Sequence, residues 1–201
     1  MIYQRLRAAK YALNWALNRN KNFPDYSLQT GGGGGGGDCA NFVSQALLAG
    51  GWPAVWWLAE ERSWWTTDRF SSKTWSTAQG LRSFLELSSR GSRCYPHELT
   101  FGDLVFIQRG QNDNRAGHVM IVTDVHESRS ADRHDPNAIR TVSLTYHSID
   151  TRNRPIKQVA FRSDATLFDY WKLADLIPPE PVSNIYRMNP PNNLRSEVRD
   201  F

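Results

Sequence analysis

The sequence has few cysteines, no long apolar run and no internal repeats. Cys39 and Cys94 are its two cysteines, too few for a disulfide framework. No stretch approaches the roughly 20 apolar residues that a membrane span requires, and the N-terminus lacks the apolar core of a signal peptide. The glycine run at residues 31–37 is not followed by the Gly-Lys-Ser/Thr ending of a phosphate-binding loop. These absences argue against disulfide-stapled, membrane-spanning and P-loop nucleotide-binding proteins.

Charge and targeting signals narrow the partners only in part. The net charge of +4 and pI near 9.2 would suit an acidic polymer, yet they are equally typical of an ordinary soluble protein. We expect a monomer with no nucleic-acid partner and no cofactor. Without a signal segment the expected location is the cytoplasm, whereas a domain cut from a longer precursor destined for the cell wall or the exterior would look the same.

The order of apolar patterns predicts an α+β fold in residues 1–177, followed by a tail at 178–201 that holds five of the ten prolines. Helical spacing is expected over 1–18, where Leu6, Ala9, Leu13 and Leu17 form one stripe, and over 39–49 and 77–89. Strands are expected at 100–108, 118–125 and 140–147, with weaker candidates at 157–161 and 167–173. The polar residues 109–117 are expected to form a hairpin loop.

The most informative stretch is residues 31–51. Asp38 is a preferred helix N-cap, and Gly50-Gly51 is a natural helix stop, so Cys39 falls in the first turn of a helix. The helix dipole and unpaired N–H groups there favour a thiolate over a thiol. Cys39 is therefore a candidate nucleophile, although a free cysteine is as often a small buried core residue.

A nucleophilic cysteine needs a base, and the second half of the chain offers one. His118 opens a predicted strand directly after Gly117, and an imidazole suits proton transfer near neutral pH. His147 ends the next strand and could orient the first imidazole, with Asp150 and Asn153 as other candidates. A zinc site made by Cys39, His118 and His147 is disfavoured, because no closely spaced ligand pair supports it.

Six of the eight tryptophans fall between Trp52 and Trp75. Indole rings stack on sugar faces and apolar side chains, so this segment could wall a substrate groove, although large core side chains are the more common explanation. The candidates for the groove are Trp56, Trp57, Trp64 and Trp65.

The motif Asp38-Cys39-Ala40-Asn41-Phe42-Val43-Ser44-Gln45 resembles the nucleophile motif of the bacterial putative amidase domain family, a branch of the papain-like superfamily related to NlpC/P60 and CHAP cell-wall hydrolases. Residues 102–105, 117–119 and 146–150 extend the resemblance to about residues 1–175. It implies a nucleophile helix packed on an antiparallel sheet. It also implies Cys39 as nucleophile, His118 as base, His147 as the third polar residue, and Asp38 beside an oxyanion hole made by the Cys39 N–H.

The sequence departs from this family at Ala40, where Thr is usual, and in the seven-glycine run. We therefore expect a cysteine hydrolase that cleaves a peptide or peptidoglycan stem amide through an acyl-thioester. Two alternatives stay open at this point. One is a binding module on the same fold that uses the tryptophan surface, and the other is a transferase that passes the acyl group to an amine.

Overall fold

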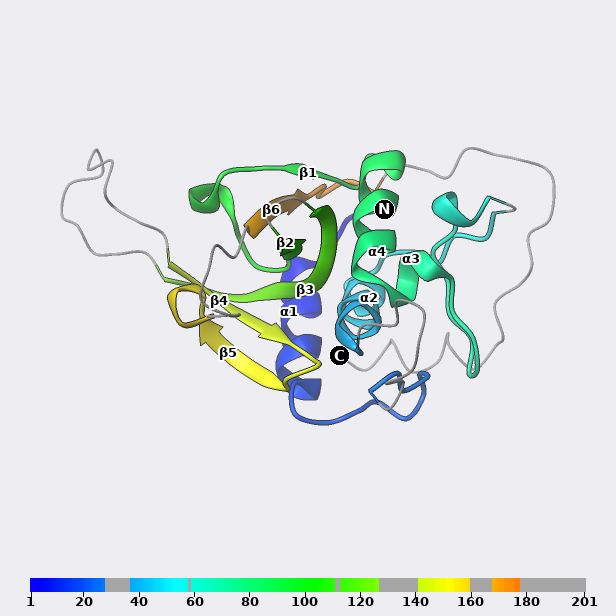
Figure 1. Ribbon diagram of the computed structural model, residues 1–201, viewed down its shortest axis with the longest axis horizontal. Helices are drawn as coiled ribbons and strands as arrows, with labels where there is room; N and C mark the ends of the chain where they lie inside the picture. Colours follow the sequence, from blue (N-terminus) through cyan, green and yellow to red (C-terminus); the bar gives the residue numbers. More distant parts are fainter. Residues whose placement is uncertain (28–36, 58, 111–112, 127–140, 160–167, 178–201) are drawn as a thin grey trace.

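The computed structural model describes residues 1–27, 37–57, 59–110, 113–126, 141–159 and 168–177 (Figure 1). Within these residues the chain forms four α-helices, three 3-10 turns and one six-stranded antiparallel sheet, so the α+β class is confirmed. The expected tail and the glycine run up to Gly36 lie outside the described residues. The helices are α1 Arg5–Trp15, α2 Cys39–Ala49, α3 Lys73–Ser76 and α4 Ala78–Ser88. The strands are β1 Gly91–Arg93, β2 Leu104–Gly110, β3 Asp113–His126, β4 Thr141–Tyr146, β5 Thr151–Pro155 and β6 Phe168–Leu173.

The strands follow the order β1-β6-β2-β3-β4-β5, and every neighbouring pair is antiparallel. β2 and β3 continue through most of the predicted hairpin loop, since β2 reaches Gly110 and β3 begins at Asp113. The candidate strand at 157–161 is wrong at its start, where Ile156–Gln158 is a 3-10 turn. β1 and β5 were not predicted, because their polar sequences lack the alternation of apolar and polar residues that indicates a strand.

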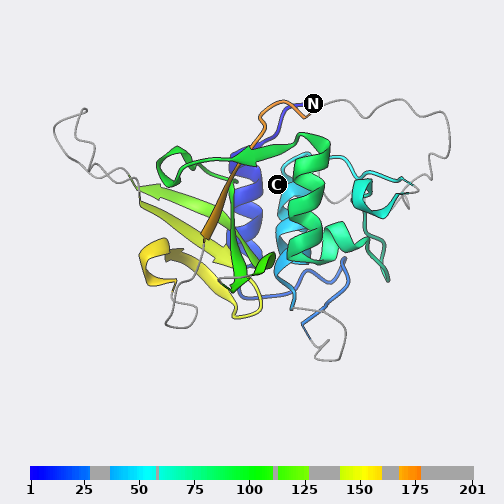
Figure 2. The ribbon, with the colours of Figure 1, turned by 45° about the horizontal axis from the view of Figure 1, so that its top comes forward.

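The three longer helices lie on one face of the sheet, with α2 in contact with both α1 and α4 (Figure 2). Val119 and Ile121 of β3 belong to the helix-side core, while Met120 and Val122 belong to a second apolar cluster. Side chains alternate between the two faces along a strand, so this pattern fixes the face of every residue in this part of β3. Leu99 and Val159 lie in segments that cover the second face.

The helix predicted over 1–18 exists as α1, but its buried side differs from the predicted leucine stripe. Leu6 and Leu17 are 59% and 58% exposed, whereas Ala8 and Ala12 are fully buried. Small alanines allow α1 to pack closely on α2, and Tyr11 adds a hydrogen bond of 2.8 Å from its hydroxyl to Gln45 Oε1. Both stripes have helical spacing, so the sequence alone does not choose between them.

Candidate active site

Asp38 stands immediately before α2 and is fully buried. Its carboxylate makes no capping hydrogen bond to the helix, which corrects the expected N-cap role. It accepts hydrogen bonds instead from His147 Nδ1 at 2.8 Å, Asn41 Nδ2 at 2.8 Å and the Tyr26 backbone N–H at 3.3 Å. It also forms an ion pair with Arg19, whose Nε lies 3.1 Å from Asp38 Oδ2. A buried carboxylate is stable only when it is paired and hydrogen-bonded in this way. Asp38 therefore joins α2 to three other parts of the chain.

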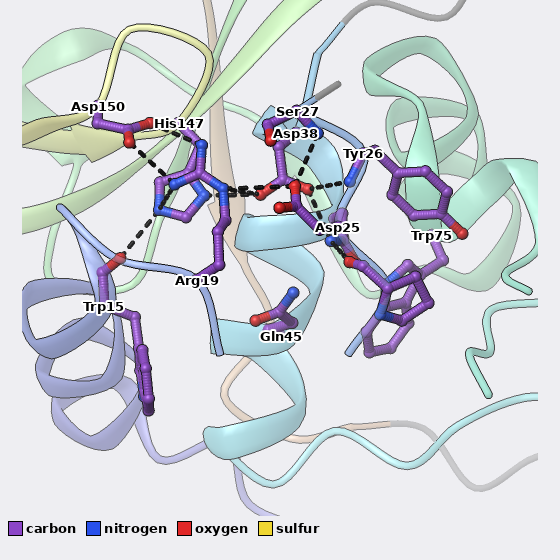
Figure 3. Close-up of polar contacts among 12 residues, drawn as sticks. Trp15, Arg19, Asp25, Tyr26, Ser27, Asp38, Gln45, Trp75, His147 and Asp150 are labelled. Carbon is purple, nitrogen blue, oxygen red and sulfur yellow. Dashed lines mark hydrogen bonds and ion pairs between the residues drawn. The ribbon is translucent and has the colours of Figure 1, made fainter. Parts of the chain in front are cut away.

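His147 follows β4 and is 2% exposed. Its Nδ1 lies 2.8 Å from Asp38 Oδ2, and its Nε2 lies 2.9 Å from the Trp15 backbone oxygen (Figure 3). Both oxygens are hydrogen-bond acceptors. The ring also stacks on Phe42, with 3.9 Å between centroids. Because both nitrogens are turned to Asp38 and Trp15, His147 does not orient His118 in this arrangement, contrary to expectation.

Arg19 is the residue of this cluster that the sequence did not point to. It lies among three carboxylates, with Nε 3.1 Å from Asp38 Oδ2 and 3.7 Å from Asp25 Oδ1, and both terminal nitrogens 2.9 Å from the oxygens of Asp150 (Figure 3). Asp150 was the alternative candidate to orient His118. In the structure its carboxylate pairs with Arg19. Arg19 sits in a polar run after α1 that carries no periodic signal, so only the folded chain reveals its role.

The thiol of Cys39 is free and 2% exposed, at the first position of α2. Burial raises the pKa of Cys39, and the charge of Asp38 adds to the rise. The backbone N–H groups of Val119 and Ala40 and the hydroxyl of Ser148 act in the opposite direction and lower the pKa of the thiol. The expectation that the helix terminus alone favours a thiolate is therefore corrected, because burial outweighs the donors.

His118 lies on the other side of β3 from the helices. It is two residues before Met120, whose side chain packs in the second cluster, and its ring meets Tyr146 edge to face at 5.3 Å. The sulfur of Cys39 is on the helix side. Burial lowers the pKa of His118 to about 4, so the ring is neutral at physiological pH. The direct pairing of Cys39 with His118 stays a prediction.

The tryptophans of the proposed groove divide into core and surface. Trp64 is fully buried, and its Nε1 donates to Ser44 Oγ at 3.1 Å, so it is a core residue and no part of a groove. Trp56, Trp57 and Trp65 are partly exposed. The rings of Trp56 and Trp65 stack with 4.5 Å between centroids and 11° between planes. This pair is the remaining candidate for a flat binding surface.

Two further surveys cover the described part of the chain. No three histidine, cysteine or acidic residues gather there in a way that could hold a metal ion. None of the helices described is both long enough and apolar enough to cross a membrane.

An α+β domain whose helix α2 begins at a cysteine and packs on an antiparallel sheet is the class that the fold and this site define. The chain belongs to the putative amidase domain family, whose profile matches residues 2–170. It is also 30% identical over 124 residues to the uncharacterized protein YhbB of Bacillus subtilis strain 168, covering 60% of this chain and 37% of that relative. The chain thus spans well under half of that longer protein. No solved structure gives a significant match.

Proposed function

We propose that the protein is a cysteine-dependent hydrolase of amide bonds, with Cys39 as nucleophile. The family description supports amide hydrolysis in general. The observation that carries the cysteine mechanism is the position of Cys39 as the first residue of α2, where the polar hydrogens of Val119, Ala40 and Ser148 act to lower the pKa of the buried thiol. Such donors stabilise negative charge on sulfur, which an inert core cysteine does not need.

In the proposed reaction the Cys39 sulfur attacks the amide carbonyl carbon, and the tetrahedral intermediate collapses to a thioester as the amine leaves with a proton. Water then attacks the thioester, which releases the acid and restores the thiol. The Cys39 backbone N–H is the proposed oxyanion donor, and Asp38 fixes the start of α2 around it. Oxyanion donors of this kind contribute about 3 kcal/mol each to lowering a barrier.

His118 is the proposed base, and its neutral ring is in the form that accepts a proton. In this role His118 takes the proton of the Cys39 thiol and passes it to the leaving amine. His147, held by Asp38 and Trp15, is proposed to position the start of α2 and to take no proton from the thiol.

The proposed substrate is a peptide or a peptidoglycan stem peptide, by resemblance to the cell-wall hydrolases of the papain-like superfamily. Trp56, Trp57 and Trp65 are the proposed binding surface. If the substrate binds to this surface, Trp65→Ala should raise KM and leave kcat unchanged. A papain-like architecture is part of the same proposal.

The test is to incubate the protein with peptidoglycan fragments and to identify the products by mass spectrometry. We expect new amine and acid ends on the fragments and an acyl adduct on Cys39 after acid quenching. Neither the new ends nor the adduct should form with Cys39→Ala. Cys94→Ala is the matched control and should behave as the wild type, since Cys94 lies against the second face of the sheet. Activity that survives Cys39→Ala would overturn the cysteine mechanism.

The same assay separates the alternatives. Transfer of the acyl group to an added amine, in place of water, would identify an acyltransferase. Binding of the fragments without any cleavage, unchanged in Cys39→Ala, would identify a binding module. The role of His118 is tested by the pH profile of Cys39 alkylation by iodoacetamide in His118→Ala, with Cys94 followed by peptide mapping. Loss of reactivity in His118→Ala but not in His147→Gln is the expected result.

A further inference from the structure

Strand β3 changes face just before His118. Ala116 belongs to the helix-side core, whereas Met120, which shares a face with His118, belongs to the second cluster. Residues two apart in a regular strand lie on the same face, so Ala116 and His118 are divided between the faces by an irregularity that lies between them. The direction of the His118 ring therefore depends on the backbone at Gly117.

The irregularity is a β-bulge at Gly117. His118 pairs with Ile107 of β2, and Ala116 pairs with the next residue of β2, Gln108, so Gly117 is one extra residue on β3. Bulges of this kind re-aim the side chains beside them and are common next to active sites. They also disturb the hydrogen bonds of the ladder, so a buried backbone donor at the bulge needs an acceptor from elsewhere.

Gln79 in the first turn of α4 provides that acceptor. The backbone N–H of Ala116 donates a hydrogen bond of 2.8 Å to Gln79 Oε1. The other end of the same amide is also held, because Gln79 Nε2 donates to Ser83 Oγ at 3.1 Å, one turn further along the helix. Gln79 thus joins α4 to β3 at the point where the strand changes face.

We propose that Gln79 is a positioning residue for His118, because its hydrogen bond to Ala116 holds the bulge at Gly117 and with it the face of the sheet on which the His118 ring lies. This inference rests on the proposed role of His118 as base. Gln79 acts through the backbone of β3 and takes no proton itself. The edge-to-face contact of His118 with Tyr146, at 5.3 Å between ring centroids, is the arrangement that the bulge maintains.

The test is nuclear magnetic resonance of the His118 ring in Gln79→Met, which keeps the length of the side chain and removes the acceptor. We expect the nuclear Overhauser effect between the rings of His118 and Tyr146 to be lost. The titration midpoint of His118 should also move from about 4 towards about 6.5, because the ring becomes less buried. Gln79→Glu keeps an acceptor oxygen and should restore the contact with Tyr146.

Gln45 provides the matched control. It is also a helical glutamine whose Oε1 accepts a hydrogen bond, but its donor is the hydroxyl of Tyr11 in α1. Gln45→Met should lower thermal stability and leave both His118 signals in place. Unchanged His118 signals in Gln79→Met, or an equal change in Gln45→Met, would overturn the proposal.

Deletion of Gly117 gives a second, independent arm. Without the extra residue, β3 is regular and its alternation alone places Ala116 and His118 on opposite faces. The contact between His118 and Tyr146 should therefore persist in the deletion variant, and Gln79→Met should no longer remove it. An equal effect of Gln79→Met with and without Gly117 would show that Gln79 does not act through the bulge, against the proposal.

The peptidoglycan assay links this inference to the reaction. Gln79→Met should lower kcat by about 10–100-fold and leave KM unchanged, because a displaced base slows the chemical step without weakening substrate binding. The resonance measurements are made without substrate. A failure of the hydrolase proposal in the peptidoglycan assay therefore leaves their outcome readable.

Discussion

His118 lies within β3 and His147 follows β4, and the two rings lie on opposite faces of the sheet in different surroundings. His147 lies among charged groups on the helix side, with Asp38 and the Trp15 carbonyl at its nitrogens. His118 lies on the other side against Tyr146, and desolvation is the cause of its lowered pKa. The comparison teaches that the surroundings of a histidine in a sheet depend on the face on which its ring lies: His147 holds segments together through hydrogen bonds, whereas His118 is kept neutral by burial.

The largest difference between the two should appear in stability at neutral pH. His147→Ala removes the ring stacked on Phe42 and one partner of the fully buried Asp38, so the free energy of unfolding should fall by about 3–5 kcal/mol. His118→Ala should cost only about 1–2 kcal/mol, as expected for a partly exposed ring. Urea denaturation at pH 7 measures both. Equal losses would mean that the Asp38 network contributes nothing beyond packing.

The pH dependence of stability should reveal His118. Its pKa is about 4 in the folded protein and about 6.5 in the unfolded chain, so the unfolded chain binds the proton first as pH falls. Stability from this group is complete above pH 6.5 and is lost towards pH 4, by up to about 3 kcal/mol.

The measurement compares urea denaturation of the wild type with His118→Gln across this pH window. Glutamine has no proton to gain, so the difference between the two curves isolates the histidine. Parallel curves would show that the ring is open to water in solution, and the contrast between the two faces would be lost.

More of the fold than of the candidate site could be predicted from the sequence. The first turn of α2 at Cys39 and the buried side of α4, with Leu81, Phe84 and Leu85, follow from local spacing and punctuation. The face of the sheet on which His118 lies does not follow from local spacing. The alternation of side chains along a strand can be read from the sequence, but which side chains face the helices is set by the pairing of β3 with β2.

The charged cluster at Asp38 was out of reach of sequence reasoning for a different reason. Arg19, Asp38 and Asp150 come from three separate segments, and none belongs to a periodic pattern that would predict their meeting. The resemblance named polar residues for the site, but the side chain that each one contacts depends on how the segments close in space. Cys39 likewise has a raised pKa because of burial, which a helix-terminus argument does not include.

The smallest expected effect on stability concerns Asp150, which pairs with Arg19 at the surface. The Asp150 side chain is 36% exposed where it pairs with Arg19, whereas that of Asp38 is fully buried. Exposed ion pairs contribute little because water screens them and long side chains lose freedom. Asp150→Asn should therefore lower the free energy of unfolding by less than about 1 kcal/mol, and this loss should shrink further in high salt. If Asp150→Asn lowered the free energy of unfolding as much as His147→Ala, Asp150 would contribute like the buried residues around Asp38. The distinction between the buried His147–Asp38 pair and the exposed Arg19–Asp150 pair would then be wrong.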